Sequence, residues 1–508
     1  MSNLIMSHRA TNERCRRHPR RCWVLGLVVA AAWLLPALSW AQEGRVPLTP
    51  PAELRFPALR FAPPQPQRAV LGNGIVVYLF EDHELPLITV HALARTGSIY
   101  APDDKVGLAR LAGTVLRSGG TERREPEALN ERLEFLAASV ESSFGVDSGT
   151  VTLSALSKDF DEVLEIFDDL LRHPAFRQEK IELARRQMLE GLRRQNDNPN
   201  SIAFREFRRL VYPGHPRGRS PSIETVSRLS RADVVEFYRR FFYPRNLMLA
   251  VSGDFETAGM LAKLERVLGT WHDERPAVAA PPPPRGETTS SLNLASKDLP
   301  QSTIVIGHLT VAENHPDFYA FTVLNTILGG GGFSSKLVSK VRAERGLAYS
   351  VGSFYRGDID YGVFAAYAQT KSQSTVEVIE LLRRILQEAT EGKISEDELA
   401  WAKESIINRF IFSFSSPEQV VMQQLQLEFK GLPEDSLRTY RDRIATVTLA
   451  DVQRVAKRFL YPRRSIALVV GDARSFTEPL SSLGQVQSIT LPVNDQPDRQ
   501  QPAAVPRP

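Results

Sequence analysis

The sequence predicts an α+β protein built from two homologous domains. Three observations lead to this fold class: a segment that recurs at a fixed distance, a proline-rich stretch between the two copies, and an uneven alternation of apolar strands with amphipathic helices. The chain has 508 residues, of which 42% are hydrophobic, so it is long enough to bury more than one core. In each domain we expect helices packed on a mixed or antiparallel sheet.

The internal repeat relates residues 232–254 to residues 450–472, with a constant offset of 218 residues. Each copy predicts a helix, a Tyr-Pro turn that ends it, and an apolar strand that runs to Gly-Asp. Four consecutive prolines start at Pro281, within a stretch that predicts a stiff, extended linker. We therefore expect domains at 65–275 and 292–490, a linker at 276–291, and a disordered tail at 491–508 that is rich in Pro, Gln and Asp.

At the N-terminus, residues 1–41 predict a secretory signal peptide. An arginine-rich segment precedes an apolar run at 23–38, and small residues follow up to Ala41. Export of this kind indicates the periplasm. The alternative is an uncleaved inner-membrane anchor, because the apolar run is near the shortest length that spans a bilayer.

The same segment accounts for the positive charge and for both cysteines. It contains six arginines and one glutamate, a net +5, so about −1 remains for the rest of a chain whose total is +4. That balance argues against nucleic-acid binding. Cys15 and Cys22 also lie here, so the processed chain has no residue for disulfide partners, thiol catalysis or a cysteine metal site.

In the first domain, residues 71–79 predict a strand entered through the Asn73-Gly74 turn, and residues 87–94 predict a second strand. Residues 160–171 carry apolar side chains at the spacing of an amphipathic helix. In the second domain, residues 318–328 predict a helix that leads into four glycines.

The glycine-rich loop consists of Gly329, Gly330, Gly331, Gly332, Phe333 and Ser334. A phosphate-binding loop is excluded, because no Gly-Lys-Ser/Thr follows and a helix stands where a strand is required. A helix is predicted through Val341, with Gly346 as its C-terminal stop and Tyr349 at the start of a strand. A plain connector between helices is the alternative reading of the loop.

Residues 107–114, Gly-Leu-Ala-Arg-Leu-Ala-Gly-Thr, resemble the Gly-Leu-Ala-His-x-x-Glu-His helix of the pitrilysin-type inverzincins, the family of mitochondrial processing peptidase and insulin-degrading enzyme. In that frame the two histidines fall on Arg110 and Thr114, the catalytic glutamate falls on Gly113, and the third ligand falls on Glu190. An arginine offers no lone pair to a metal, so the resemblance implies that this chain binds no zinc. We expect a salt bridge between Arg110 and Glu190 in place of the metal. A site assembled by the fold from the scattered histidines is the alternative.

The resemblance extends to Arg342 and Tyr349, which have the seven-residue spacing of the family's C-terminal arginine and tyrosine. It implies a clam-shell of two mitochondrial-processing-peptidase-like domains in which these two residues are catalytic, as donors to the substrate carbonyl and the oxyanion. The glycine-rich loop is then expected to bind substrate. The alternative is that Arg342 is a solvated helix residue and Tyr349 a core strand residue.

The function implied is that of a subunit without zinc in a heteromeric metalloendopeptidase. Zinc is expected in a homologous partner with an intact His-x-x-Glu-His, and short or unfolded peptides are the expected substrates. The chain is predicted to be inactive alone. The alternative is a catalytically inert peptide-binding or scaffold protein of the same fold. An independent hydrolase is disfavoured, because Ser334 and Ser335 have no base nearby in the sequence.

Overall fold

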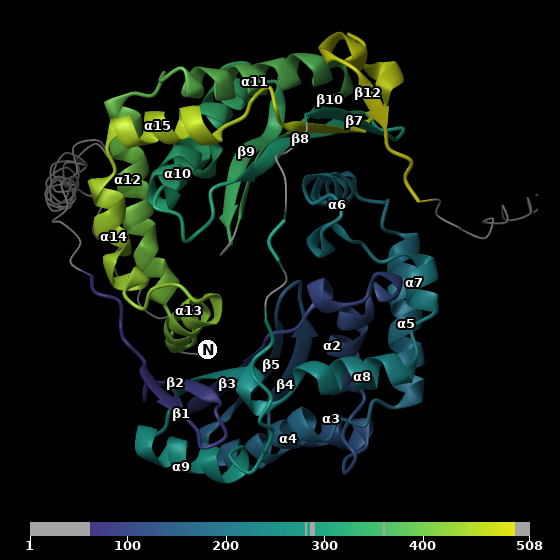
Figure 1. Ribbon diagram of the computed structural model, residues 1–508, viewed down its shortest axis with the longest axis vertical. Coiled ribbons are helices and arrows are strands. Elements are labelled where there is room, and N and C mark those ends of the chain that lie inside the picture. Colours follow the sequence, from purple (N-terminus) through teal and green to yellow (C-terminus); the bar gives the residue numbers. More distant parts are fainter. Residues whose placement is uncertain (1–60, 280–281, 285–289, 359–360, 493–508) are drawn as a thin grey trace, which may run out of the picture. The chain divides into compact units, whose positions relative to one another are not determined.

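The computed structural model describes residues 61–279, 282–284, 290–358 and 361–492 (Figure 1). The predicted signal peptide and nearly all of the predicted tail lie outside these residues, and the predicted linker is described only in part. Within the described ranges, no helix combines the length and the apolarity that a membrane span requires.

Two six-stranded mixed sheets share the arrangement of five strands and differ in the sixth, which pairs antiparallel in the first sheet and parallel in the second (Figure 1). The repeated strand, β6 or β11, lies between a parallel neighbour, β2 or β7, and an antiparallel neighbour, β3 or β8. This confirms the predicted fold class of two homologous α+β domains. In order across the first sheet the strands are β1 (Gln67–Val70), β2 (Val76–Glu81), β6 (Leu247–Gly253), β3 (Leu87–Ala94), β5 (Gly149–Leu156) and β4 (Ser139–Phe144). Across the second they are β12 (Val486–Ser488), β7 (Ser291–Ser296), β11 (Ile466–Gly471), β8 (Gln301–Thr310), β10 (Gly362–Lys371) and β9 (Ala348–Gly357).

The helices repeat as well. The helices α8 and α15 start at Arg231 and Leu449, the predicted offset of 218 residues, and each begins with a capping box, at Ser230 and at Thr448. The helices are α2 (Leu108–Ser118), α3 (Pro126–Phe135), α4 (Phe160–Arg172), α5 (Gln178–Arg193), α6 (Pro199–Val211), α7 (Ile223–Ser227), α8 (Arg231–Phe241), α9 (Thr257–Val267), α10 (Phe318–Asn325), α11 (Thr375–Thr390), α12 (Glu396–Phe410), α13 (Pro417–Lys430), α14 (Ser436–Thr446) and α15 (Leu449–Phe459).

The predicted elements of the first domain are found where expected. The strand β3 has the predicted bounds, α4 extends the predicted helix by one residue, and Asn73-Gly74 forms the turn between β1 and β2. The second domain differs in detail, because the helix expected at 318–328 changes from α-helical to π-helical at Thr326–Gly330. The helix expected after the glycines is also π-helical, over Val338–Ala343.

Two equivalent helices, α6 and α13, each pack on the sheet of the other half. They start at Pro199 and Pro417, again 218 residues apart. Ile202, Ala203 and Phe207 of α6 join a cluster with residues of β8, β10 and β11. Val421 and Leu425 of α13 join a cluster with residues of β2, β3 and β6. Alternation along the strands explains this arrangement, since one set of side chains meets the main helical layer and the other set meets the exchanged helix.

Polar contacts fix α13 on the first sheet. Arg68 donates two hydrogen bonds of 2.7 Å to the Glu428 carboxylate, and the Tyr78 hydroxyl donates a third. The hydrogen bonding from Arg68 lowers the pKa of Glu428, so this carboxylate stays charged in the contact. The Arg95 guanidinium lies 4.4 Å from the centre of the Phe429 ring and donates to the Phe429 carbonyl.

Truncation of Leu425 tests the exchange. Leu425→Ala is expected to lower the free energy of unfolding by about 2–5 kcal/mol, because it leaves a cavity between α13 and the first sheet. Gln426→Ala, at an exposed position on the same helix, is expected to change it by about 0.5 kcal/mol or less. Urea unfolding followed by circular dichroism measures both. Equal, small effects would mean that α13 does not pack on this sheet.

Candidate functional site

The predicted arginine and tyrosine lie together, with the loop phenylalanine beside them. The Arg342 guanidinium carbon is 5.2 Å from the centre of the Phe333 ring and 5.3 Å from that of the Tyr349 ring. Arg342 is in the π-helical turn, Tyr349 is the second residue of β9, and Phe333 follows the glycines. The cation is therefore held by two aromatic faces, an arrangement that contributes roughly 0.5–1 kcal/mol at an exposed site.

Both aromatic rings face solvent. Phe333 is 77% exposed and Tyr349 is 83% exposed, which overturns the alternative reading of Tyr349 as a core residue. Within the described residues, the Arg342 side chain has no ion pair and no hydrogen bond besides its ring contacts. Five guanidinium N–H groups and one phenolic hydroxyl are thus available to an incoming acceptor.

Close packing explains three of the four loop glycines. A Cβ on Gly329 would lie 2.3 Å from the Ser353 backbone nitrogen, and one on Gly331 would lie 2.2 Å from the Trp401 ring. A Cβ on Gly330 would meet the Asn325 side chain, whereas Gly332 has open space but a φ of +77°. No sequence pattern pointed to Trp401. The connector reading thus accounts for these glycines, and substrate binding by glycines 329–332, Phe333 and Ser334 stays a prediction.

The degenerate zinc helix is α2, and its three altered positions have different surroundings. Arg110 and Thr114 are exposed, while Gly113 is buried against the edge strand β4. A Cβ at Gly113 would lie 2.5 Å from the Phe144 backbone nitrogen. The Ser142 hydroxyl donates a 2.6 Å hydrogen bond to the Gly113 carbonyl. Backbone therefore occupies the space that a side chain at position 113 would need.

Glu190 does not pair with Arg110, and the predicted salt bridge is wrong. Its carboxylate lies 3.0 Å from Arg194 and 3.4 Å from Arg193 on the same α5 segment. Partners three and four residues away on one helical face are reached without ordering a distant side chain. In the described ranges, no group of three His, Cys, Asp or Glu side chains is placed to hold a metal ion.

Two models of known protein families match this chain. The model described as insulinase, peptidase family M16, matches residues 77–221, and the model described as the peptidase M16 inactive domain matches residues 228–406. The chain belongs to peptidase family M16. Its second half is of the inactive-domain type, and that half carries Arg342 and Tyr349.

Some relatives in this family are named as zinc proteases and one is named as a non-peptidase homolog. An uncharacterized zinc protease of Rickettsia felis is 24% identical over 345 residues, which cover 68% of this chain and 82% of the relative. The non-peptidase homolog YmxG of Helicobacter pylori is 24% identical over 379 residues, which cover 73% of this chain and 86% of the relative.

Solved structures share the fold. The peptidase M16 inactive domain of Pseudomonas fluorescens matches with a TM-score of 0.75 at 23% identity, over 82% of this chain and 99% of that one. The periplasmic protease PqqL of Escherichia coli matches with a TM-score of 0.68 at 16% identity, over 87% of this chain and 50% of that one.

We predict that the purified protein binds no stoichiometric zinc. Arg110 cannot bind a metal, and the Glu190 carboxylate is already paired with two arginines. Elemental analysis by mass spectrometry after dialysis against a mild chelator measures the metal content. About one zinc per chain would contradict this expectation.

Gly113→Ala is expected to lower the free energy of unfolding by about 1–3 kcal/mol, because the new methyl group would press on the backbone of β4. Gly191→Ala is the matched control, since a Cβ there meets nothing within 4 Å inside α5. The control is expected to raise the free energy of unfolding by up to about 1 kcal/mol. Thermal unfolding compares the two; stabilisation by both would show that β4 yields at position 113.

Proposed function

We propose that the protein is the subunit without zinc of a heteromeric M16 metalloendopeptidase. The supporting observation is the pair of the half-buried Arg342 and the exposed Tyr349, whose donors have no acceptor within the described part of the chain. Within the described residues, this arginine contacts two exposed rings and is bound to no carboxylate. Such a group is suited to an acceptor that arrives with a ligand.

The chemistry of the pair fits a peptide carbonyl. Arginine keeps its charge at every physiological pH, and a phenolic hydroxyl donates one hydrogen bond. Two such donors aimed at one oxygen favour the tetrahedral oxyanion over the neutral carbonyl, because the negative charge develops at that oxygen. A partner with an intact His-x-x-Glu-His supplies the zinc that activates the attacking water.

An extended peptide is the substrate class that this fold favours. The strands β4 and β9 lie at the edges of their sheets, and Tyr349 is near the start of β9. A peptide strand can add to such an edge through backbone hydrogen bonds, which suits short or unfolded peptides. The arginine-rich, then apolar N-terminal segment supports a periplasmic location.

A catalytically inert peptide-binding or scaffold protein is the second candidate. The packing of Gly329 and Gly331 favours it, because those glycines need no substrate to explain them. The two candidates differ at Arg342 and Tyr349, which only the first requires for a chemical step.

The decisive test is a peptidase assay of the protein reconstituted with its zinc-bearing partner. Alone, the protein is expected to show no activity. In the reconstituted pair, Arg342→Ala or Tyr349→Phe is expected to lower kcat by roughly ten- to a thousandfold, the range for loss of one oxyanion donor. The matched control is Arg345→Ala, since Arg345 lies one turn away and pairs with Glu377 at 3.7 Å.

Association with the partner, measured by analytical ultracentrifugation, should be the same for all three variants. Full turnover by Arg342→Ala and by Tyr349→Phe, with association intact, would reject the catalytic role. It would leave peptide binding or scaffolding as the function.

A further inference from the structure

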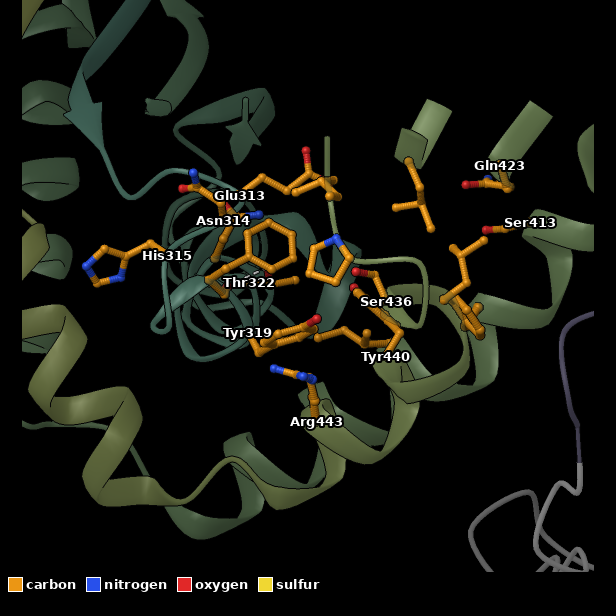
Figure 2. Close-up of a pocket in the computed structure, with 18 of the residues that line it drawn as sticks. Glu313, Asn314, His315, Tyr319, Thr322, Ser413, Gln423, Ser436, Tyr440 and Arg443 are labelled. Atoms are coloured by element: carbon orange, nitrogen blue, oxygen red, sulfur yellow. Dashed lines mark hydrogen bonds between the residues drawn. The ribbon is translucent and has the colours of Figure 1, made fainter. Parts of the chain in front are cut away.

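A cavity of about 730 Å³ lies in the helical layer of the second half, among α10, α12, α13 and α14 (Figure 2). Of the predicted site residues, only Gly330 lines it, and Phe333, Arg342 and Tyr349 do not. Its volume is in the range of pockets that hold small organic molecules. The cavity is therefore a candidate site separate from the arginine–tyrosine pair.

One wall of the cavity is aromatic. The Tyr319 and Tyr440 rings lie 5.7 Å apart, and Phe410 stacks on Tyr440 with 4.9 Å between ring centres. Leu427, Leu432 and Leu437 add apolar surface. A ligand with an apolar, ring-containing body would find matching surface here.

The cavity lining also carries two cations without carboxylate partners. Within the described residues, Arg409 has only a 3.5 Å hydrogen bond to Ser405, and Arg443 has a 3.3 Å hydrogen bond to Thr439 and a contact with the Tyr319 ring. Figure 2 shows Arg443 next to Tyr319 and Tyr440. Both guanidinium groups thus have free donors at the cavity.

The carboxylate that lines the cavity and one beside it already have partners. Glu313 lines the cavity, and its carboxylate is 2.8 Å from the Lys430 ammonium. Asp435 lies 4.0 Å from Arg438. The unbalanced charge at the cavity is therefore positive, and it lies beside the aromatic wall.

The tyrosine hydroxyls add neutral donors. Burial raises the pKa of Tyr440 to about 12 and also raises the pKa of Tyr319, so both stay protonated at neutral pH. Neither hydroxyl has a hydrogen-bond partner within the described part of the chain. A carboxylate oxygen is an acceptor that guanidinium and phenol donors both bind through charge-assisted hydrogen bonds.

We propose that this cavity binds a small organic carboxylate with an apolar, ring-containing body. The carboxylate lies against Arg443 and Arg409, and the body lies on Tyr319, Tyr440 and Phe410. Neither the zinc motif nor the arginine–tyrosine pair takes part. This inference is therefore independent of the proposed function.

Isothermal titration calorimetry of the purified full chain tests the proposal with three probes that share one apolar body. These are 2-naphthylacetate, its neutral amide, and the corresponding naphthylethylamine. The carboxylate is expected to bind once per chain, the amide at least about tenfold more weakly, and the amine more weakly still.

Variants locate the site. Arg443→Gln and Arg409→Gln are each expected to weaken carboxylate binding by about tenfold and to leave amide binding unchanged, which also shows that the cavity is still folded. Arg384→Gln, at an exposed arginine of α11 outside the cavity, should change neither. Equal affinity for carboxylate and amide, carboxylate binding that survives both arginine substitutions, or no binding at millimolar carboxylate would each overturn the proposal.

Discussion

Each sheet has apolar side chains on both faces, and both faces have to be covered. One face is covered by helices of the same half, and the other by a helix from the opposite half, α6 or α13. The strands β8, β10 and β11 point apolar side chains to both sides, so without α6 one face of the second sheet would be exposed. Likewise α13 covers Tyr78, Leu93 and Ala250 on the first sheet. Neither half can therefore complete its core from its own sequence. The exchange, with the Glu428 contacts that fix it, joins the two homologous domains into one compact unit.

This constraint also positions the candidate site. The segment between α10 and β9 contains two π-helical turns that contact the edge strand β9. The π-helix, with its hydrogen bonds from residue i to residue i+5, is rare and often occurs at functional sites. Here Gly329 packs on the backbone of β9 and Gly331, directly after the first turn, packs on Trp401, so the first turn is fixed from beneath. A binding or catalytic group requires a backbone held rigidly by its neighbours and donors that are free to contact a ligand.

The sequence predicted what depends on local periodicity. The strand β3, the helix α4, the Asn73-Gly74 turn and the repeat follow from apolar spacing and turn residues, which act over a few positions. The pairing of Arg342 with Tyr349 came instead from the resemblance to the family's arginine and tyrosine. The exchange of α6 and α13 could not be predicted, because an amphipathic helix does not encode which sheet it covers. The Arg110–Glu190 salt bridge failed for a related reason, since Arg193 and Arg194 are nearer partners on the same helix.

The loss of the zinc motif involves the backbone as well as the ligands. If the change were limited to the two histidine positions, the structure around residue 113 would still have room for the glutamate that the motif needs. Instead, the Phe144 backbone occupies that room, and Ser142 hydrogen-bonds to the carbonyl of residue 113. Restoring the three residues would therefore force β4 away from α2 and disturb the first core. A helix packed in this way serves as structure. Under the proposed function, the chemistry comes instead from donors that have no partner within the described residues. Arg342 and Tyr349 at the edge of the second sheet meet that condition.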